Sequence, residues 1–154
     1  MPLRKPLVLG SDGRLQQLQA ADSLSSDNKR TLTAAATVIA GGPVYSSGAS
    51  AFDLAQADDV DTSRVIGMAV AGITNAETGI IQTSGVLVLT TGEWDAVFGT
   101  TGGLAPDTTY YLSPGTAGLG TATCPVDVGD SIVILGIALS TTEFLVRISE
   151  PVLL

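Results

Sequence analysis

Few residues in this chain could do chemistry, and their spacing matches no catalytic pattern. There is no histidine, which removes the usual general base at neutral pH and the histidine of nucleophile pairs. The single cysteine, Cys124, excludes an intrachain disulfide. Its setting in Ala-Thr-Cys-Pro favours a small apolar side chain in the core over a nucleophile.

Four aspartates, Asp53, Asp58, Asp59 and Asp61, form the main acidic cluster. Their oxygens are ligands that a hard cation such as calcium accepts, but the spacing matches no calcium loop. Two interpretations stay open at this stage. The cluster is either a solvated acidic loop or a metal site at a subunit contact.

Glu93 and Asp95 flank the only tryptophan, Trp94. A glycosidase pair needs one carboxyl group with a raised pKa and an aromatic platform for sugar, whereas acids at the start of a helix are common. Glycines that could suggest a nucleotide loop lack the required spacing: Gly115, Gly118 and Gly120. We therefore expect a protein that is not an enzyme and that holds no metal or cofactor.

The composition indicates one domain that buries much of its surface. The chain has 154 residues, of which 45% are hydrophobic and only 14% charged, against about 25% charged in an average soluble domain. Long charged helices are excluded, and part of the burial is expected to occur between subunits. The net charge of −8 argues against a nucleic-acid partner. No apolar run is long enough for a signal peptide or a membrane span, so we expect synthesis in the cytoplasm.

The charge is unevenly distributed along the chain. Residues 1–30 contain five basic residues against three acids, a net charge of +2, whereas residues 31–154 contain two basic residues against twelve acids, a net charge of −10. Two interpretations remain: a basic arm that docks on an acidic neighbour or partner, or a chance distribution of seven basic residues. We expect two parts, an N-terminal docking arm and linker over residues 1–30 and a β-rich body over residues 31–154.

The arm contains a turn signal between two short apolar segments. Asp12-Gly13 supplies the backbone conformations of a tight hairpin between residues 7–9 and 15–18. The alternative is a short helix with Leu15, Leu18 and Leu24 on one face. The small polar residues 19–30 indicate a linker.

The body is expected to be all-β, a compact barrel or sandwich with one short helix. Short β-branched runs alternate with Gly, Pro, Asp and Ser clusters at the spacing typical of such folds. The expected strands cover residues 31–39, 43–46, 51–55, 64–73, 79–89, 109–113, 131–139 and 143–148.

The exception to the strand pattern is the segment from Thr90 to Gly99. Thr90 and Glu93 have the spacing of a capping box, and Gly99 is a typical terminator. Trp94, Val97 and Phe98 would then share one apolar face, which predicts a helix packed against the sheet; a Trp94 that stacks on a ligand is the alternative.

Two stretches of the body resemble each other. Val44-Tyr45 is followed by Val65-Ile66-Gly67, and Tyr110-Tyr111 by Ile134-Leu135-Gly136. A weak internal duplication would place the two glycines at equivalent bends, because glycine within an apolar strand often marks a bulge. Chance similarity between β-rich segments is the alternative.

Several apolar residues are candidates for contacts between subunits. Tyr110 and Tyr111 must point to opposite faces of one strand, so one of them can reach a neighbour. The chain ends on Pro-Val-Leu-Leu, which we expect to dock in its own fold or on a partner. The expected oligomer-interface residues are Tyr111, Phe144, Val152 and Leu154.

The arm and the body together resemble structural proteins of tailed-bacteriophage virions. The arm motif is Lys5-Pro6-Leu7-Val8-Leu9 with Gly13-Arg14-Leu15-Gln16-Gln17-Leu18, a lead-in that resembles those preceding β-rich bodies in such proteins. The body is similar to small head-decoration (cement) proteins through the following segments: Gly42-Pro43-Val44-Tyr45, Val65-Ile66-Gly67-Met68-Ala69, Gly103-Leu104-Ala105-Pro106, Tyr110-Tyr111-Leu112-Ser113, Gly136-Ile137-Ala138-Leu139-Ser140 and Pro151-Val152-Leu153-Leu154.

This resemblance implies a non-enzymatic homotrimer on the outer surface of the phage head, bound to the major capsid protein and stabilising the shell. The docking residues expected in the arm are Arg4, Lys5, Leu7, Leu9 and Arg14. Related modules resemble parts of tails, collars and fibres, so attachment or host-receptor binding is the alternative function. These segments are packing and turn motifs, and they indicate a family of virion modules rather than a location on the particle.

Overall fold

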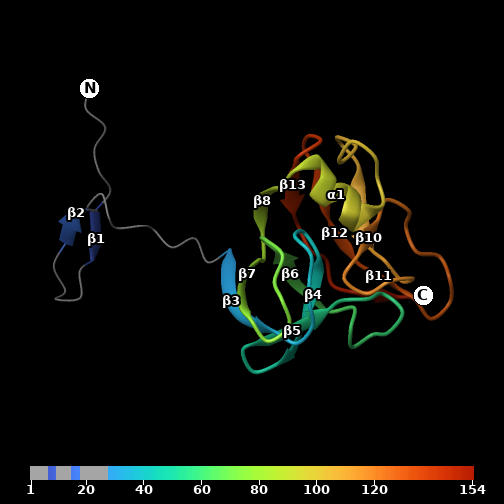
Figure 1. The fold of residues 1–154 in the computed structure, drawn as a ribbon, viewed down its shortest axis with the longest axis horizontal. Helices are drawn as coiled ribbons and strands as arrows, with labels where there is room; N and C mark the ends of the chain where they lie inside the picture. The colour runs from blue at the N-terminus through green and yellow to red at the C-terminus, as the bar shows by residue number, and fades with distance from the viewer. Residues whose placement is uncertain (1–6, 10–14, 18–27) are drawn as a thin grey trace.

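The computed structural model describes residues 7–9, 15–17 and 28–154, and these are mostly β-structure (Figure 1). Strand β1 (Leu7–Leu9) pairs antiparallel with strand β2 (Leu15–Gln17). The strands of the expected hairpin are therefore confirmed, and the helical alternative is wrong for residues 15–17. The turn between them and residues 18–27 of the expected linker lie outside the described residues.

The body begins two residues earlier than the sequence indicated. Strand β3 spans Lys29–Ala34, and its first two residues pair with Gln82 and Ile81. Lys29 and Arg30 therefore belong to the body and not to the linker. Without them, residues 1–28 contain three basic and three acidic residues, so the net positive charge expected of the arm disappears.

The first half of the body is a closed five-stranded barrel. Its strands are β3, β4 (Pro43–Gly48), β5 (Ala51–Leu54), β6 (Val65–Ala69) and β7 (Thr78–Gln82), in the spatial order β3-β5-β4-β6-β7. Antiparallel ladders join most neighbours, and the parallel pairing of β3 with β5 closes the barrel. The interior is filled by small and branched side chains around one aromatic: Ala34, Val38, Val44, Phe52, Ala69, Ile73 and Ile81.

The second half is an open five-stranded sheet with one helix, α1 (Thr91–Phe98). The strands are β8 (Gly85–Val88), β9 (Thr109–Leu112), β10 (Gly120–Thr121), β12 (Ile134–Ala138) and β13 (Glu143–Val146), in the order β10-β9-β12-β13-β8. A separate two-stranded sheet pairs β11 (Ser131–Ile132) with β14 (Val152–Leu153). The expected all-β class with a barrel and one short helix is confirmed for the described residues.

Most differences between expected and observed strands occur at turns. The run 79–89 is two strands, because Thr83 and Ser84 form a break before Gly85, whose φ is +83°. The run 131–139 is likewise divided at Val133 into β11 and β12. The two-residue strands β10 and β14 were not predicted, since they are too short to produce an alternating pattern.

The two halves have the same topology. If β3, β4, β5, β6 and β7 are matched in turn with β8, β9, β10, β12 and β13, the neighbours in the two sheets are identical, except that only the first sheet closes. Both sheets contain a register shift at the same place, in the β4–β6 ladder and in the β9–β12 ladder. The residues at equivalent positions around this bulge are Val44 and Tyr110, Tyr45 and Tyr111, Val65 and Ile134, and Gly67 and Gly136.

The turns that lead into these ladders also match. The Gly41 N–H donates to the carbonyl of Ala69, and the Asp107 N–H donates to the carbonyl of Ala138, each at 2.8 Å. Both donors have positive φ, +78° and +62°. The duplication inferred from the two glycines is thus present in the fold, and the glycines lie at equivalent bends. We call residues 29–82 the first unit and residues 85–146 the second unit.

Helix α1 forms as the sequence predicted and explains why the second sheet stays open. Thr90 is the N-cap of a complete capping box with Glu93, and Gly99 ends the helix in the left-handed conformation, with φ +65°. The helix lies beside β10, where Gly120 takes the position that Phe52 holds in the barrel. A Cβ at Gly120 would lie 2.2 Å from the Phe98 ring, so the glycine leaves room for a helix side chain in the core.

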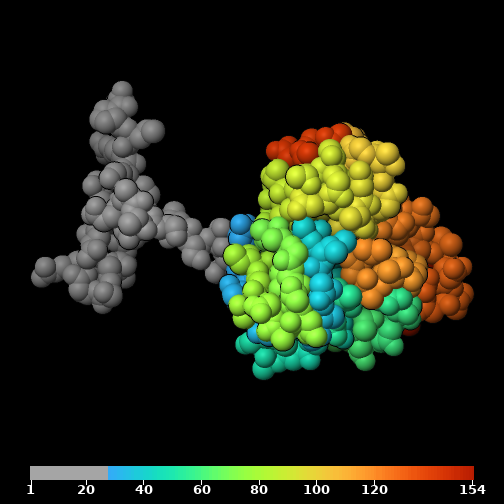
Figure 2. All heavy atoms as spheres, in the orientation of Figure 1, coloured from blue at the N-terminus to red at the C-terminus, as the bar shows by residue number. Residues whose placement is uncertain are grey.

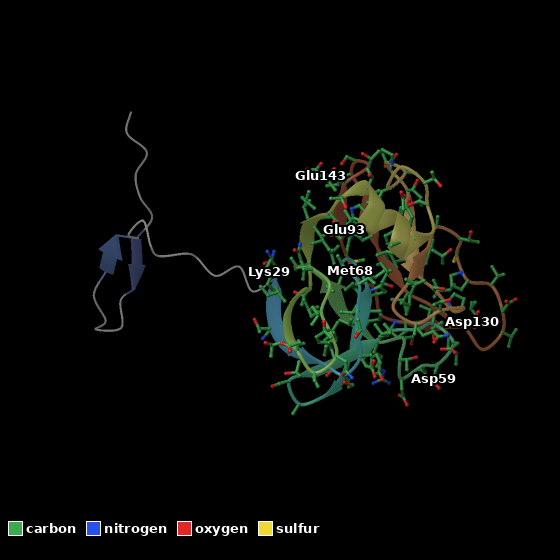
Figure 3. All side chains as sticks on the ribbon, in the orientation of Figure 1. Lys29, Asp59, Met68, Glu93, Asp130 and Glu143 are labelled. Atoms are coloured by element: carbon green, nitrogen blue, oxygen red, sulfur yellow. The ribbon has the colours of Figure 1, made fainter. Side chains whose placement is uncertain are left out.

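One large core joins the two units. Its aromatic centre comes from the second unit: the Phe98 and Tyr110 ring centroids are 4.3 Å apart, and those of Trp94 and Phe144 are 5.3 Å apart. Met68, on the outer side of barrel strand β6, is completely buried in the same cluster. Met68 lies between the two units (Figure 3), and in the space-filling view the units form one continuous surface (Figure 2).

Candidate interaction surfaces

The carboxylates around Trp94 serve the helix. Glu93 Oε2 accepts hydrogen bonds from the Thr90 N–H at 2.8 Å and from Thr90 Oγ1 at 2.7 Å. The backbone hydrogen bond from Thr90, followed by the one from its side chain, lowers the pKa of Glu93 from its ordinary value of 4.5. A general acid needs the opposite shift. The capping role inferred from the sequence is confirmed.

Asp95 organises the turn after the helix. Its carboxylate accepts hydrogen bonds from Thr100 Oγ1 and the Gly103 N–H, both at 2.8 Å, and from the Gly102 N–H at 3.0 Å. The bond from Thr100 is the main reason that the pKa of Asp95 lies below its ordinary value of 3.8. Trp94 is fully buried and donates its indole N–H to the Thr142 carbonyl at 2.9 Å, so its alternative role in stacking on a ligand is wrong.

Three of the four clustered aspartates, Asp58, Asp59 and Asp61, are exposed on a loop of the first unit, whereas Asp53 is half-buried on strand β5. Asp59 Oδ1 accepts a hydrogen bond from the Asp61 N–H at 2.8 Å, which stabilises the turn that leads to Ser63. Within the part of the chain that the structure describes, no group of three or more metal-ligating side chains converges. A metal site at a subunit contact stays a prediction.

The outer surface of the second sheet is apolar, and we call it the open face. A row of paired residues crosses four strands: Val86 lies opposite Leu145, Leu145 opposite Ile137, and Ile137 opposite Thr109. Tyr111 and Ile134 form a further pair on β9 and β12. Val86 is 46% exposed and Val88 60% exposed, and Leu145, Ile137 and Tyr111 are half-buried. β-Branched and aromatic side chains are therefore exposed to solvent on this face. A solvent-exposed sheet face normally carries polar residues.

A shallow groove of about 460 Å³ lies in the open face. It is lined by Thr109, Ile134, Ile137, Leu145, Arg147 and Ile148. Arg147 is the one cationic residue of strand β13 and its continuation, and Glu143 is its acidic counterpart on the other side of Leu145. Because residues alternate along a strand, the side chains of Glu143, Leu145 and Arg147 share the outer surface.

A second apolar surface lies at the end of the chain, and we call it the C-terminal patch. The Leu154 N–H donates to the Asp130 carbonyl at 2.9 Å, and the Leu154 carbonyl accepts from the Gly129 N–H at 3.2 Å, so the tail is held against the 122–130 loop. Asp130 and Asp59 lie at the same end of the body (Figure 3). The patch contains five exposed side chains: Val126, Val128, Val152, Leu153 and Leu154.

The four expected interface residues fall into three groups. Tyr111 lies on the open face, and Val152 and Leu154 lie on the C-terminal patch, so the structure leaves all three accessible to a partner. Phe144 is different. It is completely buried and packs against Trp94, Phe98 and Tyr110. The assignment of Phe144 to an interface is wrong, because strand alternation turns its ring into the core and leaves Leu145 outside.

The expected docking residues of the arm remain predictions. Leu7 and Leu9 are on strand β1, whose side chains are not described. Arg4, Lys5 and Arg14 lie outside the described residues. The sequence did not reveal the central residues of the open face, namely Val86, Val88, Ile137 and Leu145. A signal was present in Gly85-Val86-Leu87-Val88, but a wholly apolar strand does not reveal which side faces water.

Comparison with protein-family models gives no match for this chain, and a search of curated proteins gives no relative. Within the described part of the chain, no helix is long and apolar enough to cross a membrane; helix α1 has eight residues.

Proposed function

We propose that this chain is a structural protein of a tailed-phage virion that decorates the outer surface of the head, binds the major capsid protein and works as a homotrimer. The observation that carries the proposal is that apolar side chains are exposed on two separate surfaces of the β-body. Large exposed apolar surfaces mark interaction sites. Here two of them, the open face and the C-terminal patch, occur on one chain of 154 residues.

Three further features support adhesion as the working principle. The two carboxylates with lowered pKa values, Glu93 and Asp95, accept hydrogen bonds from the start of the helix and from the turn after it, so both have structural roles. In each unit the first strand pairs with the last, β3 with β7 and β8 with β13, which ties the ends of the unit together and suits a protein that must carry load. The arm motif resembles the lead-in of tailed-phage virion proteins, and the body segments resemble those of head-decoration proteins.

The test is binding of the purified chain to purified heads that lack it. Full-length protein should sediment with the heads and raise the temperature at which they release DNA. A variant without residues 1–27, which keeps strand β3 complete, should fold and self-associate as the parent does but stay in the supernatant. Equal sedimentation of this variant would contradict arm docking, and no sedimentation of the full-length chain would contradict the proposed function.

Copy number separates the proposal from its alternative, a tail, collar or fibre module for attachment or receptor binding. Stained gels of virions give the ratio of this chain to the major capsid protein. A ratio of the same order supports decoration of the head. A ratio of a few per cent or less would move the protein to the tail or collar and reject the location on the shell.

A further inference from the structure

The internal duplication shows what normally covers a face of this kind. Three outward positions of strands β4 and β6 in the first unit match three positions of strands β9 and β12 in the second. All six residues are apolar or aromatic. The equivalent pairs are Tyr45 and Tyr111, Val65 and Ile134, and Met68 and Ile137.

In the first unit this face is covered by the second unit. Met68 is fully buried in the core that the units share, and Tyr45 and Val65 pack against that core. The protein partner on this face is therefore a β-unit of the same topology, contributed by the same chain.

In the second unit the equivalent face is left open. Ile137 is half-buried where Met68 is completely buried, and Ile134 is 36% exposed where Val65 packs against the core. Val86 and Leu145 extend the apolar surface across β13 to β8. In proteins built from stacked repeats, the last unit needs a polar outer surface to stay soluble alone. The outer surface of this second unit carries only a few polar side chains, among them Thr109, Glu143 and Arg147, around an apolar centre.

We propose that a second copy of this chain covers the open face. The face is self-complementary in charge, because Glu143 and Arg147 lie on either side of Leu145 and each finds its opposite on another copy. The body, residues 29–154, is acidic, with twelve acids and four basic residues, so Arg147 reduces the repulsion between two copies at this face. The inference rests on the self-association part of the proposed function and names one of its surfaces. A face that pairs with itself joins two copies about a two-fold axis, so a homotrimer needs a further contact.

The experiment measures the mass of the full chain by sedimentation equilibrium across a range of concentrations. The test variant is Val86→Lys with Val88→Lys. Both side chains are exposed, so the substitutions spare the fold, which circular dichroism and the unfolding midpoint will check. We expect the parent to be an oligomer, and we expect the dissociation constant of the variant's oligomer to be at least tenfold higher than the parent's. If the double variant fails to fold, Val88→Ser is used, with a severalfold weakening expected.

Two controls make the result specific. Ile80→Lys changes an outward side chain on barrel strand β7 that is 46% exposed, as Val86 is, and it should leave the mass unchanged. Val152→Lys tests the C-terminal patch at an exposure of 59%, close to the 60% of Val88. A monomeric parent, or an oligomer that Val152→Lys dissolves and the open-face variant does not, would overturn the inference.

The charged pair Glu143 and Arg147 supplies an independent test. Glu143→Arg and Arg147→Glu should each weaken association severalfold, and the two together should restore it; additive weakening would contradict pairing between copies. Head binding is measured on the same variants. A monomeric chain that still binds heads overturns this inference and the trimer of the proposed function but leaves head decoration intact. An oligomer that does not bind heads supports this inference and contradicts head decoration.

Discussion

Phe144 offers the sharpest test of the shared core, because the sequence suggested an interface role and the structure places the ring inside. The ring is completely buried among Trp94, Phe98 and Tyr110. Replacing Phe144 with alanine deletes the ring and leaves a cavity in a rigid aromatic cluster. Such substitutions cost about 3–5 kcal/mol of the free energy of unfolding. For a domain of this size the midpoint of thermal unfolding should fall by about 10 °C or more.

Urea unfolding followed by circular dichroism gives the free energy, with all proteins at one concentration because association contributes to stability. Ile80→Ala is the matched control: its side chain is 46% exposed on barrel strand β7, outside both interaction surfaces, and it should change the free energy of unfolding by no more than about 0.5 kcal/mol. The reasoning is refuted if Phe144→Ala unfolds at the same urea concentration as the parent but loses self-association, since Phe144 would then be a contact residue and not a core residue.

Three further predictions concern single sites of the second unit and its helix. Gly120→Ala should destabilise the protein by about 1–3 kcal/mol, measured by urea unfolding, because the added Cβ meets the Phe98 ring at 2.2 Å; an unchanged midpoint would mean that the helix is not packed there. Ser131→Ala should raise the free energy of unfolding by about 1 kcal/mol, because the buried Ser131 hydroxyl has no hydrogen-bond partner; a loss of stability would indicate a partner for it. The folded-state pKa values of Glu93 and Asp95 are lowered, so their contribution to stability is present above their unfolded values of 4.5 and 3.8 and is lost as the pH falls through the folded values. The unfolding midpoint should therefore fall between pH 6 and 3, and it should fall less steeply in the double variant Glu93→Gln with Asp95→Asn. A double variant whose midpoint depends on pH as the parent's does would contradict the assignment.

The local elements were predictable because a few residues determine each of them. Thr90, Glu93 and Gly99 fixed both ends of α1, since capping chemistry depends only on neighbours in the sequence. The glycines Gly67 and Gly136 indicated equivalent bulges, and the register shifts confirm them. The end of the linker was wrong by two residues because Lys29 and Arg30 are polar but pair within a strand.

The interaction surface was only partly predictable, for a different physical reason. Strand alternation shows that Phe144 and Leu145 point to opposite sides, but not which side is the core, because both residues are apolar. The choice is made by packing partners distant in the sequence, here Trp94 and Met68. Tyr111 was assigned to the accessible side, and it is half-buried there; the same reasoning failed for Phe144.

The duplication also explains why the chain has so few charged residues. Two copies of one β-unit bring two equivalent apolar outer faces, and the fold covers only one of them, the face that contains Met68. Where the first barrel closes by pairing β3 with β5, the second sheet accepts α1 instead, and Gly120 replaces the bulk of Phe52. Helix α1 thus completes the inner side of the second sheet and leaves its outer side apolar. Selection against this exposure would have placed polar residues at Ile134 and Ile137, as an uncovered sheet face normally carries. Isoleucine at both positions agrees with the proposal that a second copy covers this face.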